Sequence, residues 1–328
     1  MSLRICVIGS CGHVGMVLEG IAESGGQQII CAYSGTEEDN ISALHSMIND
    51  RGLQSTYYPD YREMLEREQP DICVVDNVFY RHSEAASYAL SKGISTFCEK
   101  PLALNLPDLE KVSAAAKSTS AFLWAMQTMR YDPLLYTVRH LIKQGTIGEV
   151  LMLNAQKSYK LGSRPAFYRK RETFGGSIPW VAIHPIDLIH SMVDNKVEAV
   201  YATHNTNGNQ DHGELEASGQ ILLRLSGGVH AGINFDYLRP ANAPTHGDDR
   251  IRAAGTEGVL EVRAGQIYLI DRNGESQPEI ITPPSVWEAF VDAVGGRPGL
   301  ITTENSIEST RIALLAREAA DRDEIIRV

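Results

Sequence analysis

The sequence predicts an α/β fold in two domains: a doubly wound parallel sheet, then an α+β domain on a mostly antiparallel open sheet. Apolar runs alternate with helical patterns over the first 125 residues, and strand patterns without intervening helices follow from residue 150. The chain has 328 residues, more than the roughly 250 that one hydrophobic core usually serves. We therefore predict a first domain over residues 1–125 and a second over residues 126–328.

The first domain is predicted to alternate strands and helices. Apolar, β-branched runs indicate the strands, and the run ICVV is continuous, as a strand covered on both faces requires. Apolar residues at helical spacing follow from Val14 onwards. Residues 47–53 show too little pattern for an assignment. The predicted strands are 3–8, 28–33, 72–75 and 94–98, and the further helices are 61–67, 83–91 and 106–117.

The second domain is predicted to open with a helix and to continue as a sheet. Several of its strand patterns alternate apolar and polar residues, which suits an antiparallel sheet with one solvated face. We expect copies of the chain to meet on that open face, as a homodimer or homotetramer. The predicted helices are 133–144, 286–294 and 304–321, and the predicted strands are 150–156, 199–204, 218–225, 229–237 and 251–254.

Composition and charge exclude several classes of protein. Thirty Lys and Arg against 41 Asp and Glu give a net charge of −11, which disfavours nucleic acid and anionic membrane surfaces as partners. No apolar run reaches the about 20 residues of a membrane span, and residues 3–8 are too short for a signal-peptide core. We therefore expect a cytoplasmic protein. The five cysteines, an odd number without a C-x-x-C pair, are expected to be reduced thiols.

A glycine-rich turn joins the first predicted strand to the first predicted helix. It reads Gly9-Ser10-Cys11-Gly12-His13-Val14-Gly15, with G-x-x-G-x-x-G spacing. Glycine permits close backbone approach, and the amides at a helix N-terminus attract a pyrophosphate. This context predicts a dinucleotide site in a Rossmann domain, with a purely structural turn as the alternative. The residues predicted to bind the cofactor here are Gly9, Ser10, Gly12, His13, Val14 and Gly15.

The end of the second predicted strand bears on the choice between NAD and NADP. An acid at this place accepts the ribose hydroxyls in NAD-binding proteins, whereas this chain has Ser34 there. No arginine stands nearby to bind a 2′-phosphate, and the acids at 37–39 would repel one. NAD is therefore favoured over NADP, with Ser34 beside it. The alternative for residues 37–39 is a solvated loop.

A lysine after the fourth predicted strand leads to a family resemblance. Glu99-Lys100-Pro101 follows that strand, and the carboxyl edge of a parallel sheet faces the ligand crevice. Together with the glycine turn, residues 71–101 resemble the glucose-fructose oxidoreductase, inositol dehydrogenase and MocA family of nicotinamide-dependent oxidoreductases. The resemblance extends over essentially the whole chain, through RYDP at 130–133, GTIGEV at 145–150, GGSIPWVAIHPID at 175–187 and GTEG at 255–258.

The resemblance implies a role for each matching residue. The three glycines of the turn would hold the pyrophosphate, and Asn77, His82, Glu99 and Lys100 would lie along the nicotinamide half of the cofactor. Removing a hydride from an alcohol needs a base and a cation that stabilises the developing oxyanion. The implied catalytic residues are Lys100 on the hydroxyl, His184 as proton acceptor and Asp187, which orients it. The implied substrate-binding residues are Lys100, Tyr159, Trp180, His184 and Asp187.

Two positions depart from the family pattern. Trp180 stands where many members carry an aspartate four residues before the histidine, and Val78 stands where a proline often occurs. Tryptophan cannot accept a proton, but it can stack on a sugar ring. Two alternatives therefore stay open: His184 only binds substrate or is a buried structural residue, and Asp187 caps or pairs at a helix start.

Two further groups of polar residues stand out. Residues 157–171, KSYKLGSRPAFYRKR, predict a loop that meets a carboxylated or phosphorylated substrate or the cofactor, with a solvated or interface loop as the alternative. The net charge disfavours RNA binding by this loop. No metal site is predicted, because the possible ligands lack zinc spacing, although loops that brought His184 and His212 together with an acid would form one. These possible ligands are His204, His212, Glu214, Glu216, His246, Asp248 and Asp249.

Taken together, these patterns predict an NAD(P)-dependent oxidoreductase that acts on a sugar, polyol or related hydroxyl or carbonyl compound. A different class of protein remains as the alternative: a non-catalytic, dinucleotide-dependent sensor on the same fold. A metal-assisted lyase or hydrolase is the third hypothesis. The fold does not determine the substrate.

Overall fold

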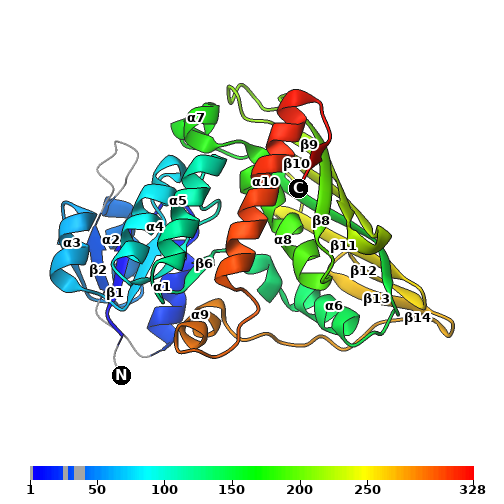
Figure 1. Cartoon of the computed structure of the whole chain (residues 1–328), viewed down its shortest axis with the longest axis horizontal. Coiled ribbons are helices and arrows are strands. Elements are labelled where there is room, and N and C mark those ends of the chain that lie inside the picture. The colour runs from blue at the N-terminus through cyan, green and yellow to red at the C-terminus, as the bar shows by residue number, and fades with distance from the viewer. Residues whose placement is uncertain (1–2, 25–28, 33–40) are drawn as a thin grey trace. The chain divides into compact units, whose positions relative to one another are not determined.

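The computed structural model describes residues 3–24, 29–32 and 41–328 (Figure 1). The chain divides into two compact units. The first unit comprises the chain up to Met126 together with residues 172–175 and 284–310, and the second comprises residues 127–171, 176–283 and 311–328. Two later segments thus join the first unit, whereas the division into domains at residue 125 stays a prediction.

The first unit contains a six-stranded parallel sheet in the order β3-β2-β1-β4-β5-β6. The order reverses between β1 and β4, and ligands of doubly wound sheets bind at the carboxyl ends of strands at such a point. The strands are β1 (Ile5–Ile8), β2 (Ile29–Ala32), β3 (Ser55–Tyr58), β4 (Ile72–Val75), β5 (Ser95–Cys98) and β6 (Leu123–Ala125). The helices are α1 (Val14–Glu23), α2 (Ile41–Asn49), α3 (Tyr61–Glu68), α4 (His82–Ser91), α5 (Leu106–Lys117) and α9 (Val286–Val294), with η1 at Phe79–Arg81.

The predicted fold class is confirmed, and the residues explain most element boundaries. All four residues of β1 and of β4 are buried, as continuous apolar runs require. Asn105 begins α5 by accepting a hydrogen bond from the Asp108 amide, and Ser285 and Glu288 form a capping box at α9. Among the strands and α-helices of the first unit given above, three were not predicted: α2, the half-exposed strand β3 and the three-residue strand β6.

The second unit contains a nine-stranded sheet in the order β14-β13-β12-β11-β7-β10-β9-β8-β15. All its pairs are antiparallel except that of β7 with β10, so the predicted mostly antiparallel sheet is confirmed. The strands are β7 (Val150–Lys160), β8 (Val197–Asn205), β9 (Ser218–Leu225), β10 (His230–Arg239), β11 (Gly247–Gly255), β12 (Gly258–Arg263), β13 (Gln266–Asp271), β14 (Gly274–Ser276) and β15 (Ile326–Arg327).

Helices α6 (Pro133–Lys143) and α8 (Ile183–Met192) pack against one face of this sheet (Figure 1). The opposite face carries large exposed apolar side chains such as Leu222. Helix α10 (Thr303–Arg322) contributes residues to both units. Short elements complete the unit: η2 (Thr128–Tyr131), η3 (Ala166–Arg169), the π-helix η4 (Ile178–Ala182) and η5 (Ser226–Gly228), while α7 (Arg171–Phe174) follows η3. In the described part of the chain, no helix has the length and apolar character to cross a bilayer.

Candidate functional site

The glycine turn lies between β1 and α1, as predicted. Gly9 has φ +77°, and a Cβ atom there would overlap the backbone of Asn77 at the end of β4. A Cβ atom on Gly12 would overlap the carboxylates of Asp76 and Glu99. Gly15 is different, because the nearest atom to an added Cβ is 3.9 Å away. Close packing therefore requires glycine at the first two positions and leaves open space at the third.

Two buried carboxylates bind the N-terminus of α1. Asp76 Oδ2 accepts hydrogen bonds from the amides of Gly12 and Val14, and Asp76 Oδ1 accepts one from His13, each at 3.1 Å. Glu99 Oε2 accepts a hydrogen bond from the His13 amide at 2.8 Å and lies 2.5 Å from His13 Nδ1. Both acids are fully buried. The helix end that attracts anions therefore already holds two carboxyl groups of the protein itself.

These two acids have opposite pKa shifts. Burial and the charge of Glu99 raise the pKa of Asp76 well above its usual value. Burial also acts to raise the pKa of Glu99, but the charges of His13 and Lys100 outweigh it and lower this pKa to about 2. Folding therefore favours the ionised form of Glu99 and disfavours the ionised form of Asp76. Sequence reasoning missed Asp76, although its position directly after the apolar run ICVV was a usable signal.

The other residues predicted for the nicotinamide half of the cofactor lie at the carboxyl ends of the same strands. Asn77 is fully buried, and neither atom of its side-chain amide has a hydrogen-bond partner among the described residues. Lys100 is 1% exposed, its amide donates to Glu99 Oε1 at 2.8 Å, and its peptide bond to Pro101 is cis. A buried unpartnered amide beside a buried lysine is the kind of donor set that a polar ligand satisfies.

His82 is buried and contacts the backbone on both sides of its ring. Its Nδ1 lies 2.9 Å from the Pro101 carbonyl oxygen, and its Nε2 lies 2.9 Å from the Asn77 carbonyl oxygen. Burial lowers its pKa. This geometry makes His82 a positioning residue for Asn77 and the Lys100-Pro101 turn, while its contact with a cofactor stays a prediction. Ser34 and the acids at 37–39 lie outside the described residues.

Three features of the first unit suit the binding of a dinucleotide: the glycines of the turn, the buried Asn77 amide and the buried Lys100. Binding would require one rearrangement at the start of α1. The amides of Gly12, His13 and Val14 are the donors that a pyrophosphate would use, and they are bonded to Asp76 and Glu99. A bound pyrophosphate therefore has to take these donors from the two acids.

In the second unit, α8 carries His184 and Asp187. His184 is 5% exposed and is the second residue of the helix. Both oxygens of Asp187 accept hydrogen bonds from Arg130, at 2.6 and 2.7 Å, and both side chains are buried. The alternative prediction for Asp187 is that it pairs at a helix start. The structure gives it a partner, Arg130, which belongs to the RYDP stretch. The π-helix η4 directly precedes α8, and such helices are frequent at functional sites.

Trp180 and Tyr159, the two aromatic residues predicted to bind substrate, each lie beside other aromatic rings of the second unit. Trp180 belongs to η4 and meets the ring of Tyr168 edge-on, with 6.1 Å between centroids. The Tyr159 ring on β7 lies 6.3 Å from that of Tyr237 and 5.2 Å from that of His246. Burial raises the pKa of Tyr159 and of Tyr237.

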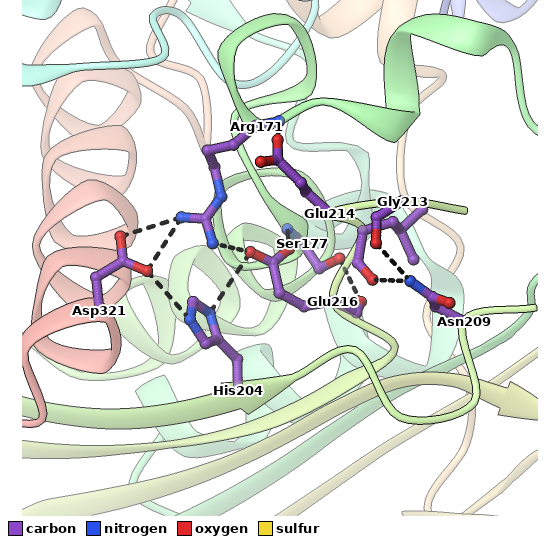
Figure 2. Close-up of polar contacts among 9 residues, drawn as sticks. Arg171, Ser177, His204, Asn209, Gly213, Glu214, Glu216 and Asp321 are labelled. Carbon is purple, nitrogen blue, oxygen red and sulfur yellow. Dashed lines mark hydrogen bonds and ion pairs between the residues drawn. The ribbon is translucent and has the colours of Figure 1, made fainter. Parts of the chain in front are cut away.

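The possible metal ligands are held by other partners. His204 Nε2 lies 3.1 Å from Asp321, and Arg171 bridges Asp321 to Glu216 (Figure 2). Glu216 Oε2 also accepts a hydrogen bond from the Ser177 amide at 2.8 Å, just before η4. His212 Nδ1 faces the carbonyl oxygen of Asn209 at 2.9 Å. The described ranges contain no group of three or more His, Cys, Asp or Glu side chains arranged to hold a metal ion.

Comparisons with known proteins match both parts of the chain. Residues 3–127 match the family described as "Oxidoreductase family, NAD-binding Rossmann fold", and residues 135–261 match the "GFO/IDH/MocA C-terminal domain". A solved structure from Thermotoga maritima, assigned as an oxidoreductase, is 41% identical, with a TM-score of 0.95 over 99% of this chain and 100% of that one.

Two relatives with named activities are more distant in sequence. Myo-inositol 2-dehydrogenase from Thermotoga maritima is 26% identical over 83% of this chain and 80% of that protein. Trans-1,2-dihydrobenzene-1,2-diol dehydrogenase from Mus musculus is 24% identical over 63% of this chain. The match spans 59% of the mouse protein, less than two thirds of its length.

Proposed function

Because this chain belongs to the GFO/IDH/MocA family of oxidoreductases, we propose that it transfers a hydride between NAD or NADP and a hydroxyl or carbonyl carbon of a sugar or polyol. The observation that carries the proposal is the buried Lys100 beside Glu99 and the unpartnered Asn77 amide, at the carboxyl ends of parallel strands. The relatives named myo-inositol 2-dehydrogenase and trans-1,2-dihydrobenzene-1,2-diol dehydrogenase support a hydroxyl compound as substrate. We favour NAD over NADP because the acids at 37–39 oppose a 2′-phosphate.

The proposed roles follow from the side chains. When bound, the nicotinamide supplies the acceptor or donor of the hydride. Lys100 binds the substrate oxygen and stabilises the negative charge that develops on it, and burial strengthens this interaction. His184 takes the hydroxyl proton. Asp187 acts as a positioning residue, because its two oxygens are committed to Arg130, and the pair holds α8 in place.

The test is a spectrophotometric assay of NADH formation with inositols and other polyols. Lys100→Ala and His184→Ala are expected to lower kcat by roughly 100-fold or more, the range of general acid–base and oxyanion contributions. Both variants are expected to keep binding NADH, followed by nicotinamide fluorescence. Unchanged kcat in both variants would refute the proposed roles.

A second function, a non-catalytic dinucleotide-dependent sensor, has one specific observation in its favour. Asp76 and Glu99 occupy the amides that a pyrophosphate uses, so the protein has a stable arrangement without cofactor. A sensor would bind NADH and a hydroxyl compound without any absorbance change at 340 nm. Turnover with any substrate decides for the enzyme.

We also propose a cytoplasmic homo-oligomer, a homodimer or homotetramer, joined through the open face of the second unit's sheet. Leu222 on β9 is 60% exposed there and Ile325 is 71% exposed. A cavity of about 590 Å³ on this face is lined by these two residues together with Met152, Tyr201 and His230. An apolar hollow of this kind is typical of a contact surface.

A further inference from the structure

Among the described residues, one arginine of the second unit, Arg164, has no acidic partner. Arg164 lies between β7 and η3, with its guanidinium carbon 5.1 Å from the ring centroid of Tyr237 and 5.6 Å from that of Tyr168. Its only hydrogen bond in the described part of the chain runs from Nη2 to the Lys160 carbonyl oxygen, at 3.4 Å. Its Nε is buried and has no hydrogen-bond partner there. A guanidinium has five N–H donors, so most of them remain to be satisfied.

The surroundings of Arg164 are positively charged. Burial lowers the pKa of His246, and the charges of Arg164, Lys160 and Lys157 lower it further. Lys157 pairs with Asp249 at 2.5 Å, whereas Lys160 Nζ donates to the carbonyl oxygen of Ala243, also at 2.5 Å. Among the described residues, only Lys157 of these three cations has a carboxylate partner. An anion beside Arg164 and Lys160 would therefore meet positive charge that no acid has paired.

Arg164 contacts the rings that lie beside Trp180 and Tyr159, two residues predicted to bind substrate. Tyr168, one of the two rings beside its guanidinium, contacts Trp180 edge-on. Trp180 lies in η4, the turn directly before α8 and His184. Tyr237, the other ring, lies beside Tyr159. All these residues belong to the second unit, so the link from Arg164 to this region rests on contacts within one unit.

We propose that Arg164 binds a carboxylate of the substrate, so that the substrate is a polyhydroxy acid or sugar acid rather than a neutral polyol. A guanidinium held between two rings presents its N–H donors in one plane, which matches a planar carboxylate in a bidentate pair. The carboxylate is bound and is not consumed. This inference rests on the proposed function, since it names the class of compound whose hydroxyl carbon loses the hydride.

The experiment compares matched substrates that differ only in the acid group: glucuronate with glucose, galacturonate with galactose, and gluconate with sorbitol. One acid of these pairs is expected to be used with a kcat/KM at least 10-fold above that of its neutral partner. Arg164→Gln should raise the KM for this acid by roughly 10- to 150-fold, the range for hydrogen bonds to a charged group, and leave the neutral partner unchanged. Arg169→Gln is the matched control, because it removes the same charge from an exposed side chain of the same loop.

A second measurement does not need turnover. The acid should raise the melting temperature of the wild-type protein and of Arg169→Gln, but not that of Arg164→Gln, whose own melting curve shows whether it is folded. If this shift occurs without turnover of any pair, binding of the carboxylate by Arg164 stands and the proposed function fails. Turnover that prefers the neutral partners, or that is unchanged in Arg164→Gln, overturns the inference and keeps the function. The inference is also overturned if inorganic phosphate alone raises the melting temperature, or if none of the anions raises it.

Discussion

Replacing Asp76 by alanine is expected to tighten the binding of NADH. In the free protein its carboxyl group accepts three amide hydrogen bonds at the start of α1, so a pyrophosphate has to displace it. Without Asp76, these amides lose a partner in the free protein and regain one when the dinucleotide binds. Of the three amides, only that of Val14 belongs to a buried residue, and an unsatisfied buried polar group costs about 1–3 kcal/mol, which corresponds to a Kd lower by about 5- to 150-fold.

The same substitution is expected to destabilise the protein in the absence of cofactor. The free energy of unfolding should fall by about the same 1–3 kcal/mol, and saturating NADH should restore it. The assays are a nicotinamide fluorescence titration and urea unfolding with and without NADH. Asp50→Ala, which removes an exposed carboxylate of the same unit, is the control. A folded Asp76→Ala protein whose Kd for NADH is unchanged or higher would refute the reasoning.

The pH dependence of stability separates Asp76 from Glu99. The pKa of Asp76 is raised on folding, so it stabilises the protein below the unfolded value of about 3.9, and this contribution is lost as the pH rises through the folded value. The pKa of Glu99 is lowered to about 2, so its contribution is present above the unfolded value of about 4.3 and is lost as the pH falls towards 2. Asp76→Asn should therefore reduce the loss of stability above pH 4, whereas Glu99→Gln should reduce the loss in acid, as measured by urea unfolding.

Three further predictions concern the turn, the buried ion pair and the open face. Gly12→Ala should lower the free energy of unfolding by about 1–3 kcal/mol because its Cβ displaces two carboxylates, whereas Gly15→Ala should raise it by up to about 1 kcal/mol, as measured by thermal melts. Arg130→Gln should cost about 3–5 kcal/mol, because Asp187 stays buried without its partner; full stability in urea would contradict this. Leu222→Asp should shift the protein towards the monomer in light scattering, and an unchanged mass would exclude this face as the contact.

The sequence predicted best those elements whose burial or capping is visible in the local pattern of apolar and polar residues. The strand at 72–75 and the helix at 106–117 match β4 and α5 residue for residue, because the first is covered on both faces and the second has a cap at Asn105. The strand β3 was missed because STYY lies half-exposed at the sheet edge and shows no alternation. Edge strands are therefore the ones that a pattern of apolar residues defines least.

The candidate site shows the same division. The glycine turn and Lys100 were found because short motifs contain them, and the structure places both at the carboxyl ends of parallel strands. Asp76 was not found as a binding group, and the prediction that the loop 157–171 meets a carboxylated or phosphorylated substrate did not single out Arg164, because its unpartnered donors are visible only in the structure. The Arg164 guanidinium lies beside the ring of Tyr168, four residues further on, and beside that of Tyr237, which is distant in sequence. A sequence pattern does not contain that information.

The bridge from Arg171 to Asp321 and Glu216 limits how far the C-terminal end of this protein can be shortened. Its guanidinium binds Asp321 in the last turn of α10 and Glu216 in the segment before β9, and Glu216 in turn holds the backbone at Ser177 (Figure 2). A truncation ahead of Asp321 would leave Arg171 and His204 with only Glu216 to share. The last turn of α10 is thus part of the support for η4, so a shortened chain has to keep Asp321.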